Sequence, residues 1–225
     1  TEVDTLSLHD ALPISLEEYR DIVRVAVEVI DGRLPVIASA GLSVETGKSF
    51  AKAAEDAGAD GILLMPPYLT ECPQDGLVAY AQQICDSTSI NVVYYNRGNG
   101  ILDAASVQAL ADACPNLIGL KDGKGDIQAL NTIIKTVGDR LVYVGGVPTA
   151  EIFAEAYLSI GVNTYSSAVF NFVPEMAVTF YKELRHGNKG RVKQITNDFF
   201  IPFVELRDRK AGYAVSLIKA GAERS

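Results

Sequence analysis

The chain has 225 residues, of which 48% are hydrophobic and 21% are charged, a balance typical of a globular protein with one large core. Its net charge of −8 disfavours nucleic acid and anionic membranes as partners, and it has no apolar run of bilayer length. Two histidines, His9 and His186, argue against a histidine triad or a histidine-rich metal site. Three cysteines without a Cys-x-x-Cys motif predict free thiols in a reducing cytoplasm.

The first fourteen residues do not share the pattern of the rest of the chain. Residues 5–14, TLSLHDALPI, show neither sustained helical nor strand periodicity. One reading frame of a common sequencing-library adapter encodes them. We therefore expect residues 1–14 to be a translated, non-native tail, which would leave His186 as the only native histidine.

From Ser15 onward, helices alternate with short apolar strands. Ser15 and Glu18 form a capping box that predicts a helix to about residue 31. The predicted strands cover residues 34–39, 61–65, 90–95, 117–121, 141–144 and 162–167. The predicted helices between them cover about 45–57, 74–86, 104–113, 126–137 and 150–160, with Asp103 and Thr149 as N-caps. The remainder, about 174–220, is predicted to be helical with breaks near Gly187 and Pro202.

The strands are near-continuous apolar runs, which indicates a parallel sheet buried on both faces. Such a series fits a doubly wound sheet or a (β/α)8 barrel. Polar residues at strand ends all along the series favour the barrel, because a doubly wound sheet would gather them at one switch point. They are Ser39, Tyr68, Tyr95, Lys121, Gly145, Gly146, Ser166 and Ser167.

A barrel of this kind has about 250 residues and eight strands. We therefore expect a TIM barrel whose first two strands are missing. Residues 15–172 would form strands 3 to 8, and residues 173–225 would form a C-terminal helical segment.

Lys121 ends the apolar run that starts at Leu117. Burial disfavours the ammonium form, so a lysine at this point can serve as an amine nucleophile. The preceding strand ends in Tyr94 and Tyr95, and a phenol can relay protons. Strand alternation sends these two tyrosines to opposite faces, so only one of them lines the barrel. A lysine and a tyrosine at the ends of consecutive strands indicate a Schiff-base aldolase or lyase.

Polar groups that end the last two strands are candidates for substrate binding. Ser166 and Ser167 could bind substrate hydroxyls or a distal carboxylate, or simply make hydrogen bonds at the strand end. Gly145 and Gly146 could let backbone N–H groups approach an anionic substrate, or could form a tight turn.

Asn96 and Arg97 could hold a distal carboxylate, because arginine binds carboxylates in a bidentate manner; Arg97 could equally be a solvated loop charge. The segment Lys121–Asp126 resembles a phosphate-binding loop only superficially, since its lysine ends a strand instead of opening a helix.

Four segments resemble the dihydrodipicolinate synthase / N-acetylneuraminate lyase superfamily of class I Schiff-base barrels, and within it most closely the 5-dehydro-4-deoxyglucarate dehydratases. They are Pro66–Leu69, Tyr95–Arg97, Gly119–Asp126 and Thr164–Pro174, within a resemblance that covers about residues 15–221. The synthases usually have a proline two residues after the Tyr-Asn pair, where this chain has Arg97-Gly98.

This resemblance implies a cytoplasmic dehydratase of glucarate degradation that also decarboxylates its 2-keto sugar acid and needs no metal or organic cofactor. Lys121 matches the Schiff-base lysine and Tyr95 the proton-relay tyrosine. Tyr68 matches a tyrosine that reaches a neighbouring subunit's site, which implies a homodimer or homotetramer. The loop that holds the substrate carboxylate in relatives should come just before Ser15 and is not found there.

Two other interpretations stay open. The chain could be an aldolase or synthase of the same superfamily that acts on another 2-keto acid. Alternatively, with two strands missing, it could be an inactive fragment with exposed sheet edges.

Overall fold

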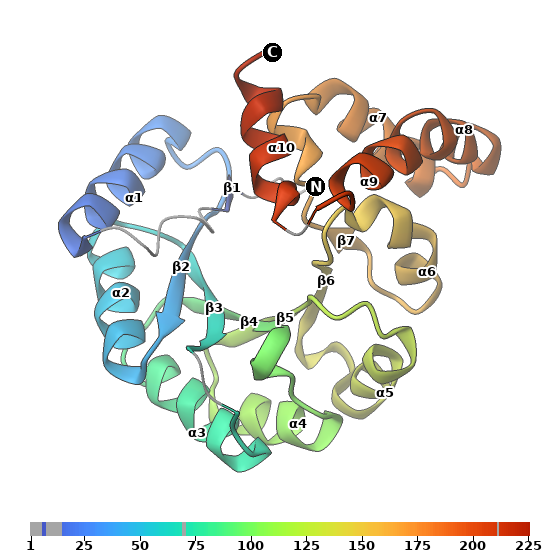
Figure 1. The fold of residues 1–225 in the computed structure, drawn as a ribbon. Coiled ribbons are helices and arrows are strands. Elements are labelled where there is room, and N and C mark those ends of the chain that lie inside the picture. The colour runs from blue at the N-terminus through green and yellow to red at the C-terminus, as the bar shows by residue number, and fades with distance from the viewer. Residues whose placement is uncertain (1–5, 8–14, 69–70, 211) are drawn as a thin grey trace. The chain divides into compact units, whose positions relative to one another are not determined.

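The computed structural model describes residues 6–7, 15–68, 71–210 and 212–225 (Figure 1). The chain forms two compact units, Thr1–Tyr143 and Val144–Ser225. In the first unit, strands and helices alternate as predicted. Its elements are β1 (Leu6–Ser7), α1 (Leu16–Ile30), β2 (Val36–Leu42), α2 (Val44–Asp56), β3 (Gly61–Pro67), α3 (Gln74–Cys85), β4 (Asn91–Asn96), η2 (Gly98–Gly100), α4 (Ala104–Ala113), β5 (Leu117–Asp122), α5 (Ile127–Val137) and η3 (Gly138–Arg140).

The strands of the first unit are parallel and follow one another in chain order from β1 to β5. Over the described residues this order never reverses, whereas a doubly wound sheet reverses at its switch point. The strand order therefore favours the barrel. The predicted strands 34–39, 61–65, 90–95 and 117–121 are confirmed as β2 to β5.

One strand was not predicted. β1 pairs with β2 through Leu6↔Val36 and Ser7↔Ile37. Two residues of backbone pairing require no side-chain periodicity, so the pattern could not reveal them. Residues 1–5 and 8–14 lie outside the described part of the chain, and the adapter origin of residues 1–14 stays a prediction.

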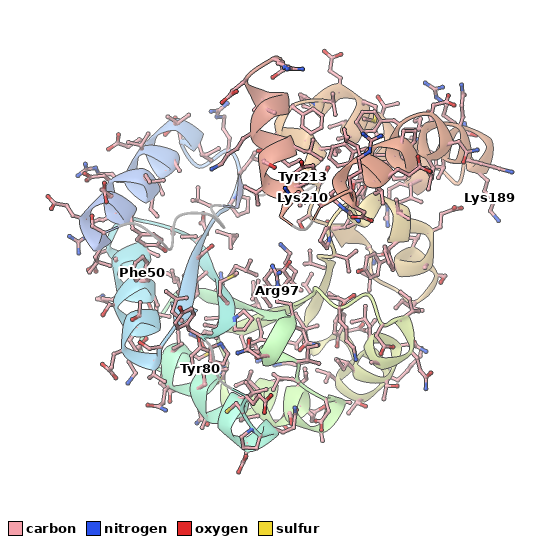
Figure 2. The ribbon with its side chains drawn as sticks, in the orientation of Figure 1. Phe50, Tyr80, Arg97, Lys189, Lys210 and Tyr213 are labelled. Carbon is pink, nitrogen blue, oxygen red and sulfur yellow. The ribbon has the colours of Figure 1, made fainter. Side chains whose placement is uncertain are left out.

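Buried tyrosines join the helices of the first unit to its strands. Tyr19 of α1 is fully buried and donates a hydrogen bond to the carbonyl of Ser39 at 2.8 Å. The edge of its ring meets Phe50 of α2, with centroids 4.6 Å apart. Tyr80 of α3 donates to the carbonyl of Met65 at 2.9 Å. Figure 2 labels Phe50 and Tyr80 on their helices. These contacts fix the helices against the strands that carry the site.

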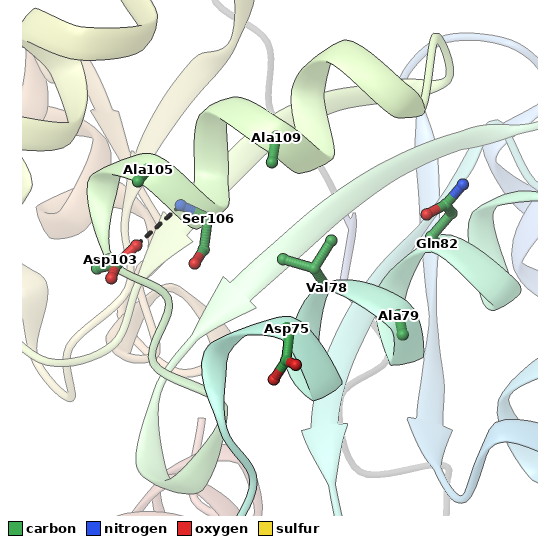
Figure 3. Close-up of a pocket in the computed structure, with 8 residues that line it drawn as sticks. All are labelled: Asp75, Val78, Ala79, Gln82, Asp103, Ala105, Ser106 and Ala109. Carbon is green, nitrogen blue, oxygen red and sulfur yellow. Dashed lines mark hydrogen bonds between the residues drawn. The ribbon is translucent and has the colours of Figure 1, made fainter.

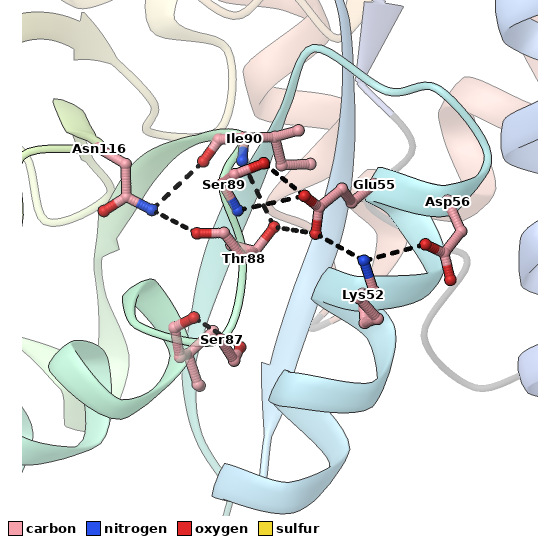
Figure 4. A network of polar contacts seen from close by, with 9 residues as sticks. Lys52, Glu55, Asp56, Ser87, Thr88, Ser89, Ile90 and Asn116 are labelled. Carbon is pink, nitrogen blue, oxygen red and sulfur yellow. Dashed lines mark hydrogen bonds and ion pairs between the residues drawn. The ribbon is translucent and has the colours of Figure 1, made fainter.

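A polar network joins α2, the α3–β4 connection and the start of β5 (Figure 4). Glu55 accepts hydrogen bonds from the hydroxyls of Thr88 and Ser89 and pairs with Lys52 at 3.3 Å. Asn116 donates through Nδ2 to three carbonyls, those of Cys85, Thr88 and Ile90. The connection between α3 and β4 is therefore held from both sides.

The second unit continues with β6 (Val142–Gly145), which crosses the unit boundary and pairs in parallel with β7 (Thr164–Tyr165). Phe180 and Phe200, both fully buried, form its aromatic core with their centroids 4.8 Å apart. Its other elements are η4 (Ala150–Phe153), α6 (Ala154–Ser159), η5 (Val169–Asn171), α7 (Pro174–Arg185), α8 (Lys189–Ile195), the π-helical η6 (Thr196–Phe200), α9 (Ile201–Arg207) and α10 (Tyr213–Ala222).

The structure corrects two predictions in this unit. Pro202 does not break the helix, because it lies in the first turn of α9, directly after the π-helical segment. The chain instead leaves the helix after Arg207 and re-enters it at Gly212, where φ is +89°. Thr149 is not a side-chain N-cap. It has a left-handed φ of 55°, and its Oγ1 accepts a hydrogen bond from Arg207 Nη1 at 2.9 Å.

Other predictions hold. The Ser15–Glu18 capping box and the Asp103 N-cap are both formed, and the break at Gly187 is present. The three cysteines are free thiols. Across the described ranges, the helices are all too short or too polar to span a bilayer.

Candidate active site

Lys121 and Tyr95 lie side by side at the carboxyl ends of β5 and β4. The strand register pairs them directly. Both are buried, with exposures of 5% and 6%. The Lys121 Nζ atom lies 4.5 Å from the centroid of the Tyr95 ring. The structure thus brings together the two residues that the sequence placed on consecutive strand ends.

The environment of Lys121 favours its nucleophilic form. Burial, followed by the positive charge of Arg97, lowers the pKa of Lys121 to about 8. Roughly a tenth of the amine is then neutral at pH 7, far more than for a solvated lysine. A neutral amine in a buried position can attack a carbonyl carbon.

Arg97 contacts the same tyrosine. Its Cζ atom lies 5.1 Å from the Tyr95 ring centroid, and its side chain is hydrogen-bonded to Tyr95. Burial raises the pKa of the Tyr95 phenol, although the Arg97 charge works in the opposite direction. A neutral phenol can both donate and accept a proton. Figure 2 labels Arg97 among the side chains of the first unit.

Gly123, which the sequence analysis did not single out, makes this packing possible. A Cβ atom at Gly123 would lie 2.7 Å from Cε2 of Tyr95 and 2.6 Å from Cβ of Arg97. Its backbone N–H donates to the carbonyl of Asn96 at 3.0 Å. In the sequence, only its position two residues after Lys121 could have indicated that Gly123 belongs to the site.

Asn96 holds a loop. Its Oδ1 accepts a hydrogen bond from the Leu102 N–H at 2.7 Å, and the residue is 4% exposed. Tyr94 donates to the Gly100 carbonyl in the same loop at 2.7 Å. Strand alternation would have predicted that Asn96 shares the face of Tyr94 and not that of Tyr95. Its contact with a substrate carboxylate stays a prediction.

The loop after Lys121 is built around Asp122. The carboxylate accepts hydrogen bonds from the backbone N–H of Lys124 at 3.0 Å and of Gly125 at 3.1 Å. Asp126 then caps α5 through the Ala129 N–H. Because the protein's own carboxylate occupies these N–H groups, the geometry agrees with the rejection of a phosphate-binding loop.

Tyr68 follows β3 and is 64% exposed, with its backbone N–H bonded to the Leu42 carbonyl at 3.1 Å. Its side chain is accessible, as a cross-subunit residue would need to be; that role stays a prediction. Ser39, predicted to end its strand, is instead fully buried inside β2, which continues to Leu42.

The second unit holds the other predicted residues. The Ser166 N–H donates to the Gly145 carbonyl at 2.8 Å. A Cβ atom at Gly145 would lie 2.6 Å from the Tyr157 ring and 2.9 Å from Tyr165 Cβ, so packing explains this glycine. Gly146 is buried. The approach of a substrate to Gly145 or Gly146 stays a prediction.

Ser167 donates a hydrogen bond at 2.5 Å to Glu151 Oε1. Glu151 is 2% exposed and was not predicted. The mostly apolar stretch after Gly146 contains both Glu151 and Glu155, and nothing in the sequence distinguishes the first from the second.

A surface groove of about 460 Å³ lies between α3 and α4 and is lined by none of the predicted site residues (Figure 3). It is lined by Asp75, Val78, Ala79, Gln82, Asp103, Ala105, Ser106 and Ala109. Within the part of the chain that the structure describes, no three His, Cys, Asp or Glu residues group as metal ligands would.

The parallel βα series with its lysine and tyrosine at adjacent strand ends is typical of (β/α)8 barrels of the class I aldolase type. The model of the dihydrodipicolinate synthetase family matches residues 10–225, and the chain belongs to this family. Crystal structures of relatives support the fold. Dihydrodipicolinate synthase from Oceanobacillus iheyensis is 26% identical, with a TM-score of 0.84 over 94% of this chain and 70% of that one. YagE, a family member from E. coli K12 in complex with pyruvate, is 27% identical, with a TM-score of 0.83 over 98% of this chain and 76% of that one.

Among curated proteins, the chain is 53% identical over 204 residues to a probable 5-dehydro-4-deoxyglucarate dehydratase of Rhodococcus opacus, covering 91% of this chain and 67% of that protein. It is 52% identical to a protein of the same name from Ralstonia nicotianae, and the match covers 89% of this chain and 64% of that protein. The chain thus spans about two thirds of the length of these relatives.

Proposed function

We propose that the chain is a Schiff-base lyase that converts 5-dehydro-4-deoxy-D-glucarate into 2,5-dioxopentanoate, water and carbon dioxide. The observation that carries this proposal is the buried Lys121 amine, whose pKa is about 8, packed against Tyr95. Relatives that are 52–53% identical carry the name of this dehydratase, and they support the choice of substrate.

Numbered from the carboxylate beside the ketone, the reaction starts when Lys121 attacks C2, and loss of water gives an iminium ion. Removal of a proton from C3 forms an enamine, which expels the C4 hydroxyl as water. The conjugated iminium then accepts the electron pair of the C5–C6 bond as carbon dioxide leaves. The product tautomerises to the C5 aldehyde, and hydrolysis releases the lysine. The lysine is the electron sink throughout, so the reaction requires neither a metal nor an organic cofactor.

Tyr95 is the proton relay for the carbinolamine and for the departing hydroxyl, since it lies against the Lys121 amine. Arg97, exposed on the loop after β4, offers its guanidinium to the distal carboxylate. Asn96 joins Arg97 at the distal carboxylate. Ser166 and Ser167 bind substrate hydroxyls or the distal carboxylate, and the backbone N–H groups of Gly145 and Gly146 approach the anionic substrate.

A homo-oligomer, either dimer or tetramer, is part of the proposal, with Tyr68 reaching a neighbouring subunit. Its high exposure supports this role. A cytoplasmic location and a place in glucarate degradation complete the proposal.

The test is reduction with borohydride in the presence of 5-dehydro-4-deoxyglucarate, read by intact mass and peptide mapping, together with measurement of released carbon dioxide. We expect an adduct on Lys121, none in Lys121→Arg, and carbon dioxide from the wild-type chain only. Absence of the adduct would end the Schiff-base assignment. An adduct with pyruvate and no carbon dioxide from the sugar acid would point to an aldolase or synthase instead.

A further inference from the structure

Glu151 is a buried carboxyl group that the proposed mechanism does not use. It is 2% exposed, and burial raises its pKa. Its Oε1 accepts a hydrogen bond from Ser167 Oγ, while its Oε2 has no hydrogen-bond partner in the described structure. A buried carboxyl group is costly, so its presence at this place needs an explanation.

The hydrogen bonds of Ser167 determine what its hydroxyl can offer to a ligand. A hydroxyl group has one hydrogen and two lone pairs. The hydrogen is donated to Glu151, and one lone pair accepts the Phe170 N–H at 3.3 Å. One lone pair is left, so Ser167 can accept a further hydrogen bond but cannot donate one.

The direction of the Ser167 hydroxyl requires that Oε1 of Glu151 carries no proton. The ionised carboxylate meets this condition, and so does the neutral group when its proton is on Oε2, the oxygen without a partner in the described structure. A proton on Oε1 would instead be donated to Ser167 Oγ and would free the Ser167 hydrogen.

We propose that Glu151 is a positioning residue that makes Ser167 a hydrogen-bond acceptor for a hydroxyl group of the substrate. Ser167 follows β7 and is partly exposed, so a ligand can reach it. A ligand carboxylate has no hydrogen to donate and would face a lone pair, whereas a sugar hydroxyl fits. The inference rests on the proposed function, in which Ser167 binds the sugar acid, and it decides which of two substrate groups Ser167 contacts.

The test compares two six-carbon 2-keto diacids by isothermal titration calorimetry. 5-Dehydro-4-deoxyglucarate carries two hydroxyl groups, and 2-oxoadipate carries none but has the same ketone and carboxylates. All titrations use a Lys121→Met background, which prevents turnover. We expect the reference chain to bind 5-dehydro-4-deoxyglucarate more tightly than 2-oxoadipate. Ser167→Ala should weaken the binding of 5-dehydro-4-deoxyglucarate about tenfold and leave the affinity for 2-oxoadipate unchanged.

Two substitutions of Glu151 separate positioning from general structural support. Glu151→Met removes the acceptor and frees the Ser167 hydrogen, which can then be donated to a carboxylate of either acid, so the variant should bind 2-oxoadipate more tightly and its preference for the hydroxylated acid should shrink. Glu151→Gln should keep it, because its amide oxygen can accept the same hydrogen. Ser159→Ala, which alters an exposed serine bonded to the Ala156 carbonyl, is the matched control and should change neither affinity.

The inference would be overturned if Ser167→Ala weakened the binding of both acids equally or left the preference unchanged. A loss of preference in Glu151→Gln would overturn it as well. Circular dichroism shows whether each variant folds; if Glu151→Met does not, Ser167→Ala and Glu151→Gln decide the outcome. Failure of the proposed function shows separately, as absence of carbon dioxide and of a Lys121 adduct in the wild-type chain.

Discussion

Two cationic side chains, Lys121 and Arg97, contact one tyrosine ring at 4.5 and 5.1 Å from its centroid. A second positive charge at Lys121 is disfavoured by burial and by Arg97, so the amine titrates near pH 8. The other charged residue that influences the ring is Asp122, which raises the pKa of Tyr95. This arrangement predicts how the reactivity of Lys121 depends on pH and on Arg97.

Replacement of Arg97 by methionine should raise the pH at which Lys121 reacts. The neutral amine is the nucleophile, so the rate of borohydride-trapped imine formation with pyruvate should rise with pH and level off above about 8 in the wild type. Arg97→Met removes the positive charge, the pKa of Lys121 rises, and the midpoint should move up by about half a pH unit.

Lys124→Met is the matched control, because it removes an exposed cation in the loop after β5 whose partner is Asp126. It should leave the midpoint where it is. An identical midpoint in Arg97→Met and the wild type would show that Arg97 does not tune the amine. Added salt should reduce the difference between the two chains, since Arg97 is exposed.

Gly123→Ala tests the packing behind Tyr95. The new methyl group would come within 2.7 Å of the Tyr95 ring and 2.6 Å of Arg97 Cβ, so the ring must move away from its place beside Lys121. We expect imine formation to slow about tenfold or more, because small displacements of a catalytic group carry large rate costs. Gly190→Ala, where the added Cβ atom would lie at an ordinary contact distance of 3.8 Å from Asn188 Oδ1, should keep the wild-type rate. A wild-type rate in Gly123→Ala would contradict the packing argument.

At the scale of elements, side chains stabilise the connections between helices and strands through hydrogen bonds to their backbone. Asn116 is the clearest example, since its Nδ2 serves three carbonyls of the α3–β4 connection at 3.0, 3.1 and 3.4 Å (Figure 4). The sheet register beyond this connection, including Tyr95↔Lys121, depends on its geometry.

Asn116→Ala should lower the free energy of unfolding by about 2 kcal/mol, because partly buried carbonyls lose their donor. Asn116→Asp should cost at least about 1 kcal/mol more, since a carboxylate cannot donate and faces three carbonyl oxygens. Urea denaturation measures both values. Gln108→Ala, which removes one exposed bond to Asp112, should stay within about 0.5 kcal/mol of the wild type. Equal stabilities of the two Asn116 variants would contradict the donor argument.

At the scale of the whole molecule, the pH dependence of stability reflects the buried carboxyl group of Glu151. Its folded-state pKa lies above the usual value of 4.5, chiefly because of burial. The neutral form is therefore favoured by folding. This contribution is fully present below pH 4.5 and is lost as the pH rises through the folded-state pKa.

Glu151→Gln should remove this contribution, because glutamine stays neutral. We expect the variant's free energy of unfolding, relative to the wild type, to increase as the pH is raised from about 4 to 8 in urea titrations. A difference that stays constant over this range would show that Glu151 ionises in the folded chain as it does in the unfolded one.

The sequence determined the order of strands and helices, the capping of α1 and α4, and the pairing of Lys121 with Tyr95. These follow from local periodicity and from the rule that parallel strands bring their carboxyl ends to one edge. Family membership confirmed the barrel class that the polar strand ends had favoured. The two-residue β1 and the continuous passage into α9 at Pro202 lay beyond such patterns.

Only the tertiary structure decided the contacts around the predicted residues. The packing of Gly123 and Arg97 on Tyr95, the inward turn of Asn96 and the bond between Glu151 and Ser167 all depend on side-chain directions and distances. Periodicity fixes the face on which a residue lies, but not which atom of a distant loop it meets. For this reason the sequence identified the nucleophile, and the structure identified the groups that tune and orient it.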